Sequence, residues 1–319
     1  MKRNLAPYYL ILALFLAGWV SSCKDIIEPD ISKRTIFLNA PGNNYQSTSY
    51  SINFWWEGID DALNYHLQVV SPKFDSIGSL ILDTVVKATR FSINLDPGNY
   101  EWRVRAENGS YKTAYSDAHN FSILYASIKN QKVQLSGPSN NSVTNKGTTT
   151  FSWGSLYGAT KYQLEIDTNN FIDETKLVYN QTIPGQQVNF TFPEDQIYQW
   201  RVKAQNDTAQ AQWSAINTLT YDHTPPDKVV LTAPDNNSFA SLPVRLQWNS
   251  VVTAAKYKIY VLKSDSTTLY NNTFPLSTAN TTYSFTSGTL GERIYWKVTA
   301  ADAAGNESAF SSLRSFVLQ

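Results

Sequence analysis

Tyr198-Gln-Trp-Arg-Val-Lys-Ala-Gln-Asn206 decides the fold of this chain, because closely similar stretches occur twice more. The other two are Tyr100-Glu-Trp-Arg-Val-Arg-Ala-Glu-Asn108 and Ile294-Tyr-Trp-Lys-Val-Thr-Ala-Ala-Asp302. In each stretch, apolar residues alternate with mostly polar ones, which is the period of a β-strand with one buried face. A helix would scatter the Trp, Val and Ala side chains around its circumference. The sequence therefore predicts three copies of one β domain.

Other landmarks recur around these strands at intervals of about 96 residues, which is the length of a whole domain and not of a solenoid repeat. Each copy has an earlier Trp with a Tyr nine residues after it, and each closes with an aromatic residue followed by Ser. These residues are Trp56 and Tyr65, Trp153 and Tyr162, Trp248 and Tyr257, then Tyr115-Ser116, Trp213-Ser214 and Phe310-Ser311. The pattern predicts sandwiches of about seven strands, with Trp residues meeting in the core.

This pattern resembles the fibronectin type III domain, which has a Trp on its second strand and a Tyr on its third. Copy one also has Leu95-Asp-Pro-Gly98 running into its sixth strand, whereas copies two and three lack a clean Leu-x-Pro-Gly there. Asp222-His-Thr-Pro-Pro226 resembles a linker common before bacterial domains of this kind. The resemblance implies an all-β chain of three tandem Ig-like/fibronectin type III β-sandwiches. The expected boundaries are domain one over residues 36–124, domain two over 132–222 and domain three over 227–319.

The N-terminal residues have the pattern of an export signal. Lys2 and Arg3 precede an apolar run from Leu5 to Val20, which is shorter than the ~20 residues of a comfortable membrane span. Val20-Ser-Ser-Cys23 resembles the lipobox of bacterial lipoproteins, in which the leader is cleaved before a cysteine that then carries the lipid. An ordinary signal peptide with a chance cysteine is the alternative. The expected boundaries are a signal peptide over residues 1–22 and a lipidated Cys23 with its tether over residues 23–35.

The lipobox implies a place for the protein in the cell. Acidic residues just after Cys23 resemble the surface-export signals of Bacteroidota lipoproteins. We therefore expect a lipid-anchored protein of the cell envelope, at the outer membrane. Cys23 is the one cysteine of the chain, so no intrachain disulfide is possible and the aromatic cores must hold the domains.

Composition and motifs give no sign of catalysis. Lys plus Arg and Asp plus Glu number 26 each, so the chain lacks the basic character of a nucleic-acid binder. His66, His119 and His223 stand at unrelated positions in the copies and are expected at the surface or in a linker. No Cys/His cluster, phosphate-binding loop or nucleophile elbow is present in the sequence. We expect no enzyme activity, no cofactor, no metal and no nucleic-acid partner.

Several charged residues come into consideration as candidate sites. Asp60-Asp61 is interpreted as part of a turn, and Asp222 with Asp302 supplies too few oxygen ligands to predict a calcium site. Cations recur at outward positions of the Trp-containing strands, either as a basic strip for an acidic glycan or as a solvated sheet face. These cations are Arg103, Arg105, Arg201, Lys203 and Lys297.

Comparison between the copies separates what the fold needs from what one copy has added. Phe54 and Trp56 must point inward, so Trp55 between them must point outward. Ser152 and Gln247 occupy its position in the other copies, so the fold does not require an aromatic residue there. Trp55 is therefore the candidate ligand contact.

The expected function is that of a non-catalytic binding module for a glycan or an envelope partner protein. An exposed indole can stack on a sugar ring or anchor a protein partner. The alternative is a structural spacer or adhesin-type rod without a small-molecule ligand. In that case Trp55 would be covered by the tether from Ile26 to Ile36 or by a neighbouring side chain.

Overall fold

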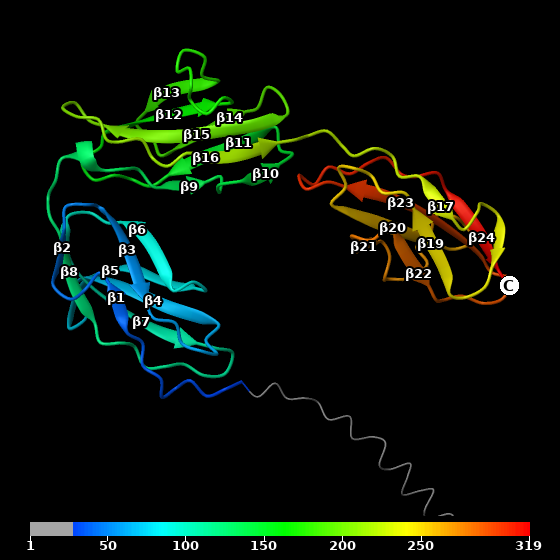
Figure 1. Ribbon diagram of the computed structural model, residues 1–319, viewed down its shortest axis with the longest axis horizontal. Helices are drawn as coiled ribbons and strands as arrows, with labels where there is room; N and C mark the ends of the chain where they lie inside the picture. Colours follow the sequence, from blue (N-terminus) through cyan, green and yellow to red (C-terminus); the bar gives the residue numbers. More distant parts are fainter. Residues whose placement is uncertain (1–27) are drawn as a thin grey trace, which may run out of the picture. The chain divides into compact units, whose positions relative to one another are not determined.

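The computed structural model describes residues 28–319, and every structural statement below refers to that part of the chain (Figure 1). It contains strands β1 to β24 and one short 3-10 helix, η1 (Ile128–Asn130). The predicted all-β fold of three tandem sandwiches is confirmed. The chain divides into two compact units after Ala126, and each is considered by itself. None of the described residues forms a helix long and apolar enough to cross a membrane.

Domain one contains a three-stranded sheet in the order β1-β3-β6 and a five-stranded sheet in the order β2-β8-β7-β4-β5. Its strands are β1 (Leu38–Ala40), β2 (Tyr45–Ser47), β3 (Ser51–Trp56), β4 (Asn64–Lys73), β5 (Ser76–Val86), β6 (Arg90–Asn94), β7 (Gly98–Glu107) and β8 (His119–Ile123). All neighbouring strands are antiparallel except β2 and β8, which are parallel.

Domain two has the same two sheets, in the orders β9-β11-β14 and β10-β16-β15-β12-β13. Its strands are β9 (Leu135–Gly137), β10 (Ser142–Thr144), β11 (Thr148–Trp153), β12 (Lys161–Asp167), β13 (Tyr179–Ile183), β14 (Gln187–Thr191), β15 (Gln196–Gln205) and β16 (Asn217–Tyr221).

Domain three repeats the arrangement with β17-β19-β22 and β18-β24-β23-β20-β21. Its strands are β17 (Leu231–Ala233), β18 (Ser238–Ala240), β19 (Val244–Trp248), β20 (Lys256–Leu262), β21 (Leu276–Thr278), β22 (Thr282–Phe285), β23 (Arg293–Ala301) and β24 (Arg314–Leu318).

Each sandwich has eight strands instead of the predicted seven, because the first strand is split between the two sheets. The split falls at a Pro-x-Asn-Asn sequence that occurs in every copy, at residues 41–44, 138–141 and 234–237. The second Asn has a positive φ, 63° at Asn44, which Asn tolerates better than most residues. The first Asn accepts a hydrogen bond from the last strand, as Asn43 Oδ1 does from the Asn120 N–H at 3.0 Å. The motif thus moves the chain from the small sheet to the large one.

The six recurring Trp side chains fill the cores, with at most 3% of each exposed. In domain one the rings of Trp56 and Trp102 lie 6.5 Å apart between the two sheets, as predicted. The recurring Tyr also satisfies a backbone donor, since the hydroxyl of Tyr65 accepts a hydrogen bond from the Ile59 N–H at 2.9 Å. Tyr162 and Tyr257 accept the equivalent bonds in the other two domains.

The tyrosine before the core Trp forms a corner in two domains. Tyr100 donates to the carbonyl oxygen of Asp96 at 2.7 Å, and Tyr198 donates to that of Glu194 at 2.8 Å. Domain two therefore builds the corner without the Leu-x-Pro-Gly sequence that precedes it in domain one. Domain three has Ile294 at this position and lacks the hydroxyl.

The recurring aromatic-Ser pair has a backbone function. Ser116 Oγ accepts a hydrogen bond from the Val104 N–H at 3.2 Å, and Ser214 Oγ accepts one from Val202 at 3.0 Å. Ser311 does the same for Val298. The segment before the last strand is thereby fixed against the central strand of the large sheet, which is β7, β15 or β23.

Part of the expected tether lies on domain one. Ile31 is fully buried, and the side-chain amide of Asn108 donates to the carbonyl oxygen of Pro29 at 2.9 Å. Arg34 donates to the carbonyl oxygen of Asp60 at 2.7 Å and forms an ion pair with Asp61 at 3.2 Å. The docked segment, which we define as Pro29–Arg34, is therefore packed structure and not a free linker. Asp60-Asp61 lies in a turn, as interpreted from the sequence.

Candidate functional site

Trp55 points away from the core of domain one. Strand β3 alternates strictly between exposed and buried residues, with Phe54 and Trp56 inside, and 44% of Trp55 is exposed. The predicted orientation is therefore correct, whereas a role in binding stays a prediction. Cys23, the predicted lipidation site, lies outside the described residues.

The immediate neighbours of Trp55 come from the strands on either side. Ala40 of β1 and Arg90 of β6 are its cross-strand partners. The guanidinium carbon of Arg90 lies 5.2 Å from the centre of the indole, within the range of a cation–π contact. Arg90 partly covers Trp55, but the docked segment does not bury the indole.

A groove extends from Trp55 along the outer side of β3. It consists of two adjacent depressions that share Ala40 and Asn53. The first is lined also by Phe54, Trp55, Arg90 and Ser92, and the second by Pro41, Gly42, Tyr45, Ser47, Ser49, Ser51 and Ile52. We call it the Trp55–Tyr45 groove, because each depression is lined by one exposed aromatic residue; Tyr45 is 48% exposed.

The groove between the two aromatics is polar and almost uncharged. Ser92 Oγ donates to the side-chain oxygen of Asn53 at 2.5 Å, which holds that amide across β3 and β6. Arg90 is the one charged residue among those that line the two depressions. Such a surface offers amide and hydroxyl groups to a ligand but little electrostatic attraction.

Sequence reasoning found one aromatic residue of this groove, Trp55, and missed the other, Tyr45. Tyr45 pairs with Phe121, and the residues in the equivalent pairings of domains two and three are Ser142 and Ser238. Tyr45 is therefore as specific to domain one as Trp55. The same comparison between copies would have found it, had the split first strand been recognised.

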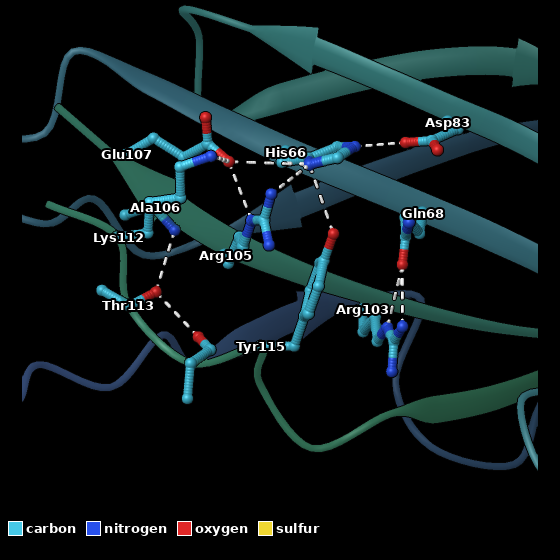
Figure 2. Close-up of polar contacts among 11 residues, drawn as sticks. His66, Gln68, Asp83, Arg103, Arg105, Ala106, Glu107, Lys112, Thr113 and Tyr115 are labelled. Atoms are coloured by element: carbon cyan, nitrogen blue, oxygen red, sulfur yellow. Dashed lines mark hydrogen bonds and ion pairs between the residues drawn. The ribbon is translucent and has the colours of Figure 1, made fainter. Parts of the chain in front are cut away.

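A second polar site lies on the outer face of the large sheet of domain one (Figure 2). Its centre is His66, whose Nδ1 lies 3.1 Å from a guanidinium nitrogen of Arg105 and 3.2 Å from the hydroxyl of Tyr115. Arginine can only donate, so Nδ1 must accept and Nε2 carries the proton that is donated to Asp83. His66 points outward from β4 as predicted, but only 17% of its side chain is exposed, because neighbouring side chains engage its polar atoms.

The charges around His66 compensate one another. Glu107 pairs with Arg105 at 2.8 Å and with Lys112 at 3.7 Å. The hydrogen bond from His66 lowers the pKa of Asp83, and burial raises the pKa of Tyr115. The cluster is thus an internally satisfied network that ties β4, β5 and β7 to the segment after β7. It leaves no group aimed at a free ligand position.

The recurring cations are stacked on aromatic rings in all three domains. Arg103 lies between Phe74 and Tyr115, at 4.1 and 4.2 Å from the ring centres. Arg201 lies over Trp213 at 4.1 Å and is 9% exposed, and Lys297 lies over Phe310 at 3.7 Å. Because every copy has this stack, it belongs to the fold, and it forms neither a basic strip nor a solvated face.

The remaining acidic and histidine residues serve local structure. Both carboxylate oxygens of Asp302 accept hydrogen bonds from its own turn, from Gly305 and Asn306. His223 contacts Asp195, and this hydrogen bond is the main reason that the pKa of Asp195 falls to about 2. Among residues 28–319 no group of three or more His, Cys, Asp and Glu side chains is arranged to hold a metal ion.

No protein-family model and no curated protein matches the chain. Among solved structures it is similar to the FN1–FN3 domains of chicken CNTN1, with 16% identity over 88% of this chain and 96% of that one, at a TM-score of 0.42. It is also similar to the fibronectin(III)-like modules of Clostridium thermocellum CbhA, with 14% identity over 59% of this chain and 94% of that one, at a TM-score of 0.39. Both are fibronectin type III structures, and neither similarity bears on function.

Proposed function

We propose that this chain is a lipid-anchored, non-catalytic protein of the cell envelope. Domain one binds a glycan or an envelope partner protein through the face around Trp55. The observation that carries the proposal is the exposure of an indole at a position where the other two domains have Ser152 and Gln247. Burying a large aromatic side chain on binding contributes strongly to affinity, which makes an exposed and copy-specific Trp a candidate contact.

The proposed anchor rests on the sequence Val20-Ser-Ser-Cys23, whose resemblance to a lipobox supports a location at the outer membrane. Cys23→Ser is expected to leave the protein unlipidated, because the side chain that would accept the lipid is gone. Partitioning of the wild type and the variant between detergent and aqueous phases measures this. An unchanged share in the detergent phase would show that Cys23 is not the anchor.

Binding is tested with immobilised glycans and with purified envelope fractions. Trp55→Ala is expected to weaken binding by at least ~1 kcal/mol while the melting curve stays unchanged. Phe239→Ala is the matched control, since Phe239 is a 67% exposed aromatic residue on β18 of domain three. Equal affinities of wild type, Trp55→Ala and Phe239→Ala would remove Trp55 from the site.

The alternative function is that of a spacer or adhesin-type rod without a small-molecule ligand. The Trp core and the stacked cations occur in all three domains and stabilise the fold without offering a ligand site. These shared features support the spacer alternative. On this alternative, neither glycans nor envelope fractions bind in a way that depends on Trp55.

A further inference from the structure

We propose that the Trp55–Tyr45 groove binds a linear, uncharged oligosaccharide. The inference rests on the proposed binding function of domain one and names the ligand class. Its starting point is that each of the two depressions of the groove is lined by an exposed aromatic ring, and that both rings are absent from the other domains.

The two rings suit the faces of sugar rings. A pyranose has C–H groups on its faces and hydroxyls around its rim, so its face packs on an aromatic ring while its rim needs hydrogen-bonding partners. Trp55 and Tyr45 are 44% and 48% exposed, and each also has a polar group at its edge. Arg90 contacts the indole of Trp55 and presents further N–H donors beside it.

The floor of the groove suits the rim of a sugar. Asn53, Ser51 and Ser49 line the same depressions as the two aromatic residues, and Ser92 lies beside Asn53. These side chains donate and accept hydrogen bonds without charge. No carboxylate lines either depression, and Arg90 supplies the one cation. An acidic glycan would call for several cations, so the charge of the groove favours a neutral ligand.

The length of the groove favours a chain of sugars over a single one. Trp55 and Ser51 are four residues apart on β3, which corresponds to ~13 Å at the rise of a β-strand. Tyr45 lines the second depression together with Ser51, whereas Trp55 lines the first. A ligand that touches both aromatic residues must therefore extend over more than one ring.

An extended peptide fits the observations less well. Peptides commonly bind by adding a strand to an open sheet edge. The side of β3 next to β1 is paired only at Trp55 and Trp56, so an open edge is present. The same edge is open in domain two, where β9 pairs only with Ser152 and Trp153 of β11. Domain three has the same open edge, and an edge common to all three domains does not explain aromatic residues specific to one.

The test is a titration of the full mature chain with neutral linear oligosaccharides of increasing length, namely β-glucan, α-glucan, mannan and xylan series. Affinity is expected to rise from the monosaccharide to the tetrasaccharide in at least one series. Trp55→Ala and Tyr45→Ala are each expected to lower the affinity for the longer ligand at least 5-fold. Phe239→Ala should leave it unchanged, and melting curves confirm that all variants fold.

Three results would overturn the proposal: no binding in any neutral series, preference for acidic oligosaccharides, or a Tyr45→Ala variant that binds like the wild type. These results differ from a failure of the proposed function. If no oligosaccharide binds but an envelope protein binds in a manner that depends on Trp55, the binding function stands and the ligand class is wrong. If Trp55→Ala changes neither kind of binding, both fail.

Discussion

Trp102 and Trp200 occupy the same place in two domains but differ in one hydrogen bond, which allows a controlled prediction. The indole N–H of Trp102 donates to the carbonyl oxygen of Pro41 at 3.1 Å, whereas that of Trp200 is buried without an acceptor. Both indoles are fully buried, and each contacts a Phe ring edge-on, at 5.0 Å for Trp102 and 5.1 Å for Trp200. Their burial and their Phe contact are therefore matched, although Trp102 also lies near the rings of Trp56 and His119, at 6.5 and 6.1 Å.

Replacing each Trp by Phe removes a similar apolar area and leaves a similar cavity, which costs about 2 kcal/mol at both positions. At Trp200 the change also removes an unpaired buried N–H group, which offsets about 1–2 kcal/mol of that loss of stability. At Trp102 it breaks a hydrogen bond and leaves the Pro41 carbonyl oxygen poorly paired, which adds about 1 kcal/mol or more. We expect a cost of about 3 kcal/mol for Trp102→Phe and about 1 kcal/mol or less for Trp200→Phe.

Native-state hydrogen exchange of the full chain measures both costs, because peptides from β7 and β15 report on the stability of their own domains. The slowest amides of β7 should exchange more than 100-fold faster in Trp102→Phe, whereas those of β15 should change less than about 10-fold in Trp200→Phe. Equal losses, or a larger loss at Trp200, would refute the hydrogen-bond argument and leave packing alone as the explanation.

Three further predictions concern other contacts. The hydrogen bond from His66 lowers the pKa of Asp83, so the ionised carboxylate contributes to stability above the ordinary carboxyl pKa and this contribution is lost as the pH falls below about 4. In acid titrations followed by fluorescence, Asp83→Asn should be as stable as the wild type at low pH and less stable above pH 5. Ser214→Ala removes the acceptor of the buried Val202 N–H and should cost about 1–3 kcal/mol, seen as faster exchange in β15; unchanged exchange would contradict the role of the aromatic-Ser pair. Ile31→Asp should release the docked segment, with faster exchange at residues 108–111 and no change in domain three.

Much of the fold was readable because the strands have one buried face. The alternation around Trp102 and Trp55 predicts the direction of both side chains correctly. The split of the first strand was missed because it depends on backbone conformation at Asn44 and its equivalents, which periodicity does not record. The signal was nevertheless present in the repeated Pro-x-Asn-Asn sequence.

The surroundings of His66 could not be read from the same alternation. A strand pattern indicates only that a side chain leaves the core, and not what lies over it. Here Tyr115, from a segment about fifty residues later, covers the outer face beside His66. For the groove, likewise, Trp55 was predictable from β3 alone, whereas Tyr45 joins it only through the crossing of the chain to β2.

The docked segment sets how far domain one can stand from a lipid bilayer. Four residues lie between Cys23 and Glu28, where the described structure begins, so the two are five positions apart, and a fully extended chain covers at most ~18 Å over that span. If Cys23 carries the lipid, this short span holds one end of domain one close to the lipid headgroups. That end is formed by the turn at Asp60 and the loop at Asn108, which contact the docked segment. The position of β3 then puts Trp55 at the end of the groove nearer the bilayer and Tyr45 at the end farther from it. A polymer approaching from the medium would reach Tyr45 first.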